Sequence, residues 1–112
     1  MTLSDVARKL GLKPFTSSAS LDREVEGAYV GDLLSDVMAN AKEGCVWITA
    51  QVHPNIVAVA ALKDLCGIIL AAGRTPDPET VQKAESEGVP ILGGDESSFE
   101  LAGRLYELGV RG

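Results

Sequence analysis

Three polar residues that could bind or convert a ligand, Thr49, His53 and Asn55, lie close together between two apolar runs. The run at 45–50 predicts a short buried strand, and the run at 56–62 predicts a helix with Asn55 as its N-cap. Because the first amides of a helix have no partner within it and the helix dipole is positive there, polar or anionic ligands bind well at such a place. We therefore expect part of any small-molecule site here. A threonine ending a buried strand and an asparagine capping a helix are equally expected without a ligand.

His53 is the only histidine of the chain, and histidine is the side chain that most readily transfers protons near neutral pH. A catalytic base requires an orienting group, and a nucleophile requires the base. The spacing identifies neither Ser97 nor Ser98 as such a partner. The sequence therefore favours a structural or ligand-orienting role for His53 and assigns no catalytic residue. A small enzyme that uses His53 as acid or base on a phosphorylated or carboxylated metabolite remains an alternative.

Two further loops carry groups suited to an anion. Arg74 is the only cation among these loops and lies between Gly73 and Thr75, where it could pair bidentately with a phosphate or a carboxylate. A surface ion pair is the alternative role for Arg74. Gly94 lets the backbone approach a ligand closely, although Asp95 beside it would repel a phosphate.

The elements that position these residues follow from hydrophobic periodicity and from helix start and stop signals. Strands are predicted at 24–30, 45–50, 67–71 and 89–92, and residues 13–20 are predicted to be a loop or an irregular extended segment. Helices are predicted at 2–10 with Thr2 as N-cap, at 33–41 with Asp32 as N-cap, from Asn55 onward, from Pro78 to Gly88 with Asp77 as N-cap, and over Phe99–Leu108 with Ser97 or Asp95 as N-cap.

Strands that alternate with helices through short connections predict the fold class α/β: a single three-layer domain, residues 1–112, with a mainly parallel sheet flanked by helices. The order of the strands is not readable. Ligands of such sheets bind beyond the carboxyl ends of the strands. The candidate ligand-binding residues are therefore Thr49, His53, Asn55, Gly73, Arg74, Thr75, Gly94, Ser97 and Ser98.

Composition excludes several classes of function. The net charge of −6 opposes binding to nucleic acid, and no apolar run approaches the ~20 residues that span a bilayer. The start of the chain lacks the features of a secretory signal, so we expect a soluble cytoplasmic protein. Cys45 and Cys66 fit no zinc or redox motif and are predicted to be buried reduced thiols. No metal ion and no cofactor is expected, and no phosphate-binding Gly-x-x-x-x-Gly-Lys-Ser/Thr motif supports a kinase.

The helix that follows Asn55 gives a signal of another kind. Residues 57–61 are apolar all round, which is typical of a helix covered on both sides. In a domain of this size the second cover is the N-terminal segment or another copy of the chain, and an isologous dimer is the commonest symmetric arrangement. We therefore expect a homodimer.

Most of the chain, from about Leu3 to its C-terminus, resembles the DRTGG domain. The similar segments are Gly31–Val37, Trp47–Thr49, His53–Ala60, Ile68–Arg74 and Gly88–Leu92. That family is similar to a module inserted between CBS regulatory domains in some inorganic pyrophosphatases and to a module of bacterial phosphotransacetylases. The resemblance implies a regulatory or dimer-forming α/β module. The motif that names the family is not intact, because Ala71 and Ala72 stand where a Thr-Gly pair is common.

Two classes of function remain beside the small enzyme. The first is a non-catalytic regulatory module that binds a small anionic metabolite or nucleotide at the strand ends, or docks on a partner enzyme. The second is a purely protein-docking accessory subunit without a ligand. The sequence does not identify the ligand, the partner or the pathway.

Overall fold

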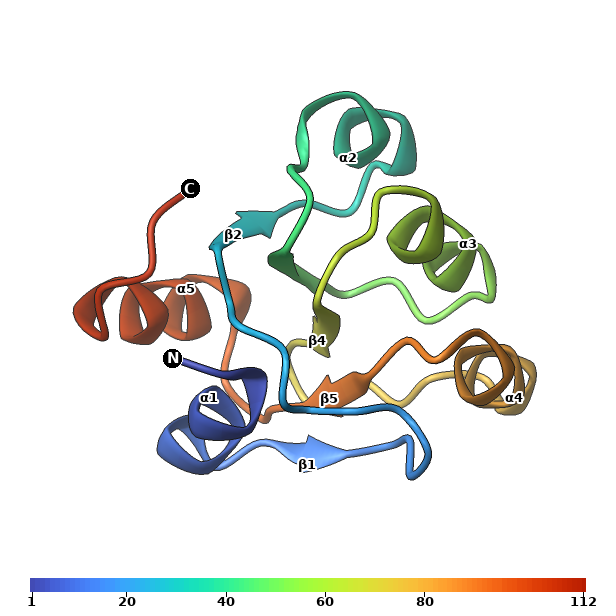
Figure 1. Cartoon of the computed structure of the whole chain (residues 1–112), viewed down its shortest axis with the longest axis horizontal. Coiled ribbons are helices and arrows are strands. Elements are labelled where there is room, and N and C mark those ends of the chain that lie inside the picture. Colours follow the sequence, from blue (N-terminus) through green and yellow to red (C-terminus); the bar gives the residue numbers. More distant parts are fainter.

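The computed structural model describes residues 1–112 and consists of one five-stranded sheet between two layers of helices (Figure 1). The strand order is β1-β5-β4-β3-β2, in which β2 to β5 are parallel and β1 is antiparallel to β5. The helices are α1 (Leu3–Leu10), α2 (Leu34–Asn40), α3 (Asn55–Leu62), α4 (Pro78–Glu87) and α5 (Ser98–Glu107), and the strands are β1 (Lys13–Pro14), β2 (Gly27–Val30), β3 (Cys45–Thr49), β4 (Gly67–Leu70) and β5 (Ile91–Gly93). The predicted fold class is confirmed.

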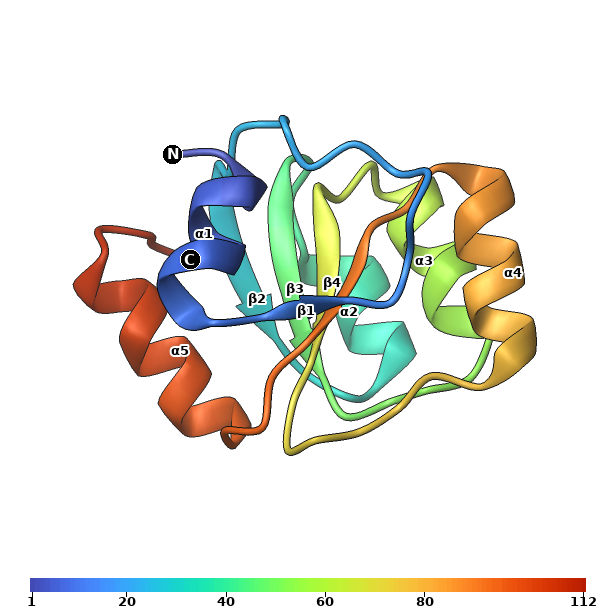
Figure 2. The ribbon, with the colours of Figure 1, turned by 90° about the horizontal axis from the view of Figure 1, so that it is seen from below.

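Each face of the sheet is buried under its own helices, and the strand register decides which residues lie on which face. Trp47 pairs with Ile68 and Ile68 with Ile91, so these three side chains form one row beneath α2, α3 and α4. The next row along the strands, which includes Ile48 and Ile69, lies beneath α1 and α5. Figure 2 shows the two helical layers on opposite sides of the sheet. Side chains alternate between the faces of a strand, so a strand in the middle of such a sheet is apolar throughout.

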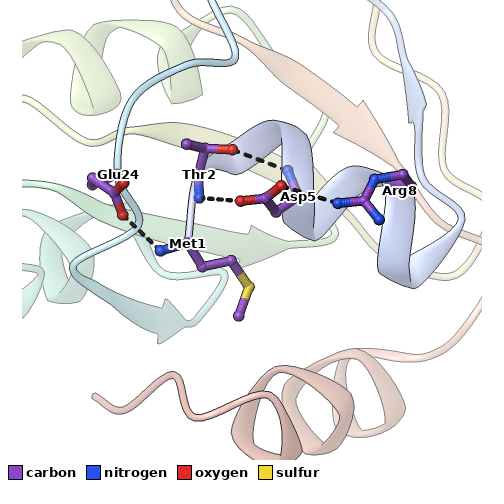
Figure 3. Close-up of polar contacts among 5 residues, drawn as sticks. All are labelled: Met1, Thr2, Asp5, Arg8 and Glu24. Atoms are coloured by element: carbon purple, nitrogen blue, oxygen red, sulfur yellow. Dashed lines mark hydrogen bonds and ion pairs between the residues drawn. The ribbon is translucent and has the colours of Figure 1, made fainter.

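The first helix begins as its sequence predicts. Thr2 is the N-cap, its hydroxyl accepts from the Asp5 amide at 3.1 Å, and the Asp5 carboxylate accepts from the Thr2 amide at 2.9 Å (Figure 3). Arg8 pairs with Asp5, and the amino terminus of Met1 pairs with Glu24. The predicted N-caps Asp77 and Ser97 also hold that position at the start of α4 and α5, and Pro78 is the first residue of α4.

Two predicted helix caps are wrong. The N-cap of α2 is Leu33, because the Asp32 carboxylate instead accepts hydrogen bonds from the Thr49 hydroxyl at 2.8 Å and the Ala50 amide at 2.7 Å. The N-cap of α3 is Pro54, and Asn55 is the first helical residue. At α2 the Asp32 side chain is engaged by the neighbouring β3 connection, and at α3 the Asn55 backbone amide donates to His53 Nδ1. Local periodicity reveals neither contact.

The segment predicted to be a loop or irregular extended segment at 13–20 includes the edge strand β1. Lys13 pairs with Gly93, the Phe15 amide donates to the Ile91 carbonyl at 2.8 Å, and the buried Thr16 hydroxyl accepts from the Ile91 amide at 3.2 Å. Pro14 has no amide hydrogen, which suits a strand at the edge of a sheet.

Both cysteines are free and buried, which confirms the prediction. Burial raises the pKa of the Cys45 thiol and raises that of Cys66 to about 12, so both are held as thiols rather than reactive thiolates.

The two longest helices, α4 and α5, have 10 residues each, and no helix is long and apolar enough to cross a membrane.

The segment after β1 is held on α4 by one carboxylate. The amides and hydroxyls of Ser17 and Ser18 all donate to Glu85, at 2.8 to 3.0 Å. These bonds, led by that of the Ser18 amide, lower the pKa of the Glu85 carboxyl to about 2. The ionised carboxylate is therefore the form that the folded protein favours.

We predict that Glu85→Gln reduces the loss in the free energy of unfolding between neutral and acid pH. Because the pKa of Glu85 is lower in the folded than in the unfolded chain, its contribution is present above the unfolded value near 4.5 and is lost as the pH falls from there toward 2. Urea unfolding between pH 7 and pH 2.5 measures this. Glu87→Gln, which removes an exposed carboxylate of the same helix, is the control. An equal fall in stability with pH in the wild type and Glu85→Gln would contradict the prediction.

Candidate functional site

The carboxyl ends of the four parallel strands lie at one edge of the sheet, at the bottom of the view in Figure 2. Two of the three predicted loops meet there. The Ala72 amide donates to the Glu96 carbonyl at 2.7 Å, and the Gly73 amide donates to the Gly94 carbonyl at 2.9 Å. The connections that follow β4 and β5 are therefore tied to each other by their backbones, because these strands are neighbours in the sheet.

A hollow of about 210 Å³ lies between these two connections and β1. It is lined by Lys13, Phe15, Gly73, Arg74, Thr75, Gly93, Gly94 and Asp95. Four of the predicted site residues are thus brought together. Sequence reasoning missed Lys13 and Phe15, because the antiparallel pairing of β1 with β5 carries them to this edge from a segment without periodicity. A lysine and an aromatic residue flanking a proline were the only local signal.

Arg74 is exposed and belongs to none of the four ion pairs of the protein, and the same holds for Lys13. The structure therefore does not support the alternative role of Arg74 as a partner in a surface ion pair. Arg74 is the only cation within the predicted loops, and β1 adds a second one, Lys13, to the lining of the same hollow. Two cations facing one hollow are suited to a phosphate or a carboxylate.

Thr49 lies apart from this hollow and has a structural role. Its side chain is fully buried, and its hydroxyl donates to the Asp32 carboxylate and accepts from the Gln51 amide. These bonds join the connections that follow β2 and β3. This arrangement agrees with the alternative in which Thr49 ends a buried strand without contacting a ligand.

His53 and Asn55 are exposed on the connection between β3 and α3. The Asn55 amide donates to His53 Nδ1 at 3.2 Å, so the imidazole caps the start of the helix. No carboxylate forms a hydrogen bond or an ion pair with His53, and neither residue lines the Arg74 hollow. The arrangement orients His53 but does not give it the orienting carboxylate of a catalytic base.

Ser97 and Ser98 lie at the start of α5. The Ser97 hydroxyl accepts from the Glu100 amide at 3.2 Å and so caps the helix, and Ser98 is the first helical residue. Neither serine lines the hollow. The nine predicted residues are therefore divided among the hollow, with four of them, the end of β3, with Thr49, the region from His53 to the start of α3, and the start of α5. Whether they bind a ligand stays a prediction.

Three other concave surfaces lie outside this hollow, one of which, of about 380 Å³, is lined by Met1, the start of β2 and the residues that follow α5. The largest, about 400 Å³, follows the edge strand β2, and its charged lining residues are two carboxylates, Glu26 and Glu43, and one cation, Lys42. A groove of about 300 Å³ between α2 and α3 is lined by Leu34, Met38, Asn55, Ala58, Val59 and Leu62. Nowhere do three or more His, Cys, Asp or Glu side chains gather in a way that could hold a metal ion.

Comparison with known families matches residues 5–108 to the DRTGG domain. Among solved structures, the chain is similar to the CBS and DRTGG domains of the regulatory region of Clostridium perfringens pyrophosphatase, solved with the activator diadenosine tetraphosphate. The two share 14% sequence identity with a TM-score of 0.67, over 90% of this chain and 44% of that chain. The chain thus spans less than half of the structure it resembles. No curated protein matches it.

The Arg74 hollow depends on a strained residue. Ala72 has φ 58° and Gly73 has φ 68°, both in the left-handed region, and Ala72 carries a Cβ that disfavours this conformation. A Thr-Gly pair is common in the family where this chain has Ala71 and Ala72. A glycine at position 72 would adopt the same backbone without strain.

We predict that Ala72→Gly raises the free energy of unfolding by about 1 kcal/mol, because relief of the left-handed strain outweighs the extra freedom of glycine in the unfolded chain. Urea unfolding at pH 7 measures the change. Ala71→Gly is the matched control, since Ala71 is buried and has no positive φ, and it should destabilise the protein. A loss of stability in Ala72→Gly as large as that in Ala71→Gly would refute the assignment of strain.

Proposed function

The chain belongs to the DRTGG domain family, and on that premise we propose that it is a non-catalytic regulatory module that binds a small anionic metabolite or nucleotide at the carboxyl ends of its strands. The binding place is the hollow lined by Gly73, Arg74, Thr75 and Gly94 together with Lys13. In this proposal, ligand binding at the hollow changes how the chain interacts with a partner subunit or enzyme.

The observation that carries this proposal is the pair of cations that face the hollow without an internal partner. The chain has 10 Lys and Arg against 16 Asp and Glu, so most of its surface repels an anion. Among the residues that line the hollow, the two cations Lys13 and Arg74 stand against the single carboxylate of Asp95. A local excess of positive charge on an acidic protein directs an anionic ligand to one place.

The absence of a catalytic arrangement around His53 favours binding over catalysis. Its Nδ1 accepts from the backbone, and the ring lies outside the Arg74 hollow. A small enzyme would need a base and a substrate-binding group in one pocket. The similar pyrophosphatase structure supports the same proposal, because its CBS and DRTGG domains form a regulatory region that was solved with a nucleotide activator. That ligand belongs to the pyrophosphatase, and we carry over only the regulatory class.

A second surface supports association with another protein chain, and here we propose a second copy. The groove between α2 and α3 is almost entirely apolar. Leu62, which lines it, is 73% exposed, and Leu33, near the start of α2, is 68% exposed. Exposed apolar side chains in a cluster mark an interface. A two-fold axis through this groove would pack α3 against its copy and supply the cover that residues 57–61 lack on their outer side. Docking on a different protein is the alternative.

We predict that pyrophosphate, used as a probe, stabilises the protein and that Arg74→Gln removes the effect. A ligand that binds only the folded state adds ~2.7 kcal/mol at a hundred times its dissociation constant. A thermal-shift titration measures it. Lys42→Gln, which removes an exposed cation at the opposite end of the sheet, is the charge-matched control and should respond as the wild type does. An equal shift in Arg74→Gln and Lys42→Gln would refute the site, and no shift with any anion would favour the accessory-subunit reading.

We also predict a homodimer at micromolar concentration that Leu62→Glu converts to a monomer, because two buried carboxylates would face each other across the axis. Light scattering coupled to size exclusion gives the mass. Phe99→Glu places the same charge on an apolar residue of α5 that is 81% exposed, on the other side of the sheet, and should leave the dimer intact. A monomeric wild type would exclude this interface.

A further inference from the structure

The hollow beside Arg74 is completed by a segment of the chain that sequence reasoning left without a role. Lys13 lies in β1 and Phe15 follows that strand directly. The antiparallel pairing of Lys13 with Gly93 sets Lys13 at the carboxyl end of β5. The Phe15 backbone lies opposite Ile91, but its ring lies against Gly93, so both residues line the hollow with Arg74 and Asp95. The hollow therefore joins two cations, a carboxylate and an aromatic ring.

None of its charged groups is satisfied within the protein. Lys13, Arg74 and Asp95 take part in no ion pair, whereas Arg23, Asp32 and Glu85 elsewhere are held by internal partners. The amides of residues 75 and 95 also donate to no protein atom. The side chains of Lys13, Arg74 and Asp95 belong to residues that line one hollow, and they are free to bind a ligand.

Asp95 restricts the chemistry of that ligand. A simple anion such as phosphate presents acceptors to Lys13 and Arg74 but also places negative charge beside the Asp95 carboxylate. A ligand that combines an anionic group with hydroxyl or amino donors satisfies both, because the donors can bind the carboxylate while the anion lies at the cations. The hollow is therefore matched to a ligand with two different polar ends.

Phe15 adds a flat apolar surface. Its ring lies over the backbone of Gly93, where a Cβ on Gly93 would lie 2.4 Å from Phe15 Cε2, so the glycine makes room for the ring. The ring is half-buried and packs partly against the core, and part of it lines the hollow. An aromatic ring held in this way can stack on a planar group of a ligand at little entropic cost.

We propose that the hollow binds a nucleoside monophosphate, with the phosphate at Lys13 and Arg74, a ribose hydroxyl or base amino group at Asp95, and the base against Phe15. The volume of about 210 Å³ lies below the ~300–1,000 Å³ of sites for larger ligands, which favours a mononucleotide over a dinucleotide. The inference rests on the proposed function, since it names the ligand class for the same anion site.

The test compares adenosine 5′-monophosphate, inorganic phosphate and adenosine as probes by isothermal titration calorimetry of the full chain. The nucleotide should bind at least about tenfold more tightly than either fragment, and Phe15→Leu should weaken the nucleotide by about tenfold while phosphate binding is unchanged. Arg74→Gln should weaken both nucleotide and phosphate. Phe15→Tyr keeps the ring and should keep the preference, which separates loss of stacking from loss of folding. Nuclear Overhauser effects between the adenine protons and the Phe15 ring would report the contact directly.

The outcomes separate the two proposals. Equal affinity for phosphate and the nucleotide, with no effect of Phe15→Leu, would overturn the nucleoside monophosphate inference and leave the anion site in place. Adenosine binding as tightly as the nucleotide, with no effect of Arg74→Gln, would overturn both. Binding of none of the three probes would also overturn both.

Discussion

Burial of β3 and β4 on both faces is the constraint on which the rest of the structure depends. Every residue of these two strands is buried. The row formed by Trp47, Ile68 and Ile91 is covered by helices on one face of the sheet, and the row that includes Ile48 and Ile69 is covered by different helices on the other face. A parallel sheet in this position requires crossover helices on both sides. The same crossovers bring all four carboxyl ends to one edge, so the candidate site is a consequence of how the core is covered.

The backbone at that edge is already engaged. Amides of the β4 connection bind carbonyls of the β5 connection, and Asp32 joins the connections of β2 and β3. The candidate ligand-binding side chains therefore lie on a backbone that is held by its own hydrogen bonds, which would lower the entropic cost of binding. The backbone hydrogen bonds of Ala72 and Gly73 to the β5 connection hold Ala72 in its left-handed conformation despite the strain.

The hollow and the apolar groove are connected by few residues. Thr75 lines the hollow, and the Asp77 amide two residues later donates to the Val52 carbonyl at 3.2 Å. The Thr80 hydroxyl binds the same carbonyl at 2.6 Å. From Val52 the chain enters α3, whose first residue Asn55 lines the groove between α2 and α3. A ligand that shifts the β4–α4 connection would thus act on the start of the helix proposed to pair with its copy.

The sequence by itself determined the α/β class, the mainly parallel sheet, the Thr2 N-cap and the burial of both cysteines, because these depend on local periodicity and on residues a few positions apart. The tertiary structure alone decided that Asp32 binds Thr49 rather than capping α2, and that Lys13 and Phe15 complete the hollow. It also set Pro54 rather than Asn55 as the N-cap of α3. The physical reason is the strand order. It sets which loops are neighbours, and residues as far apart in the chain as Lys13 and Gly93 carry no local signal of their pairing.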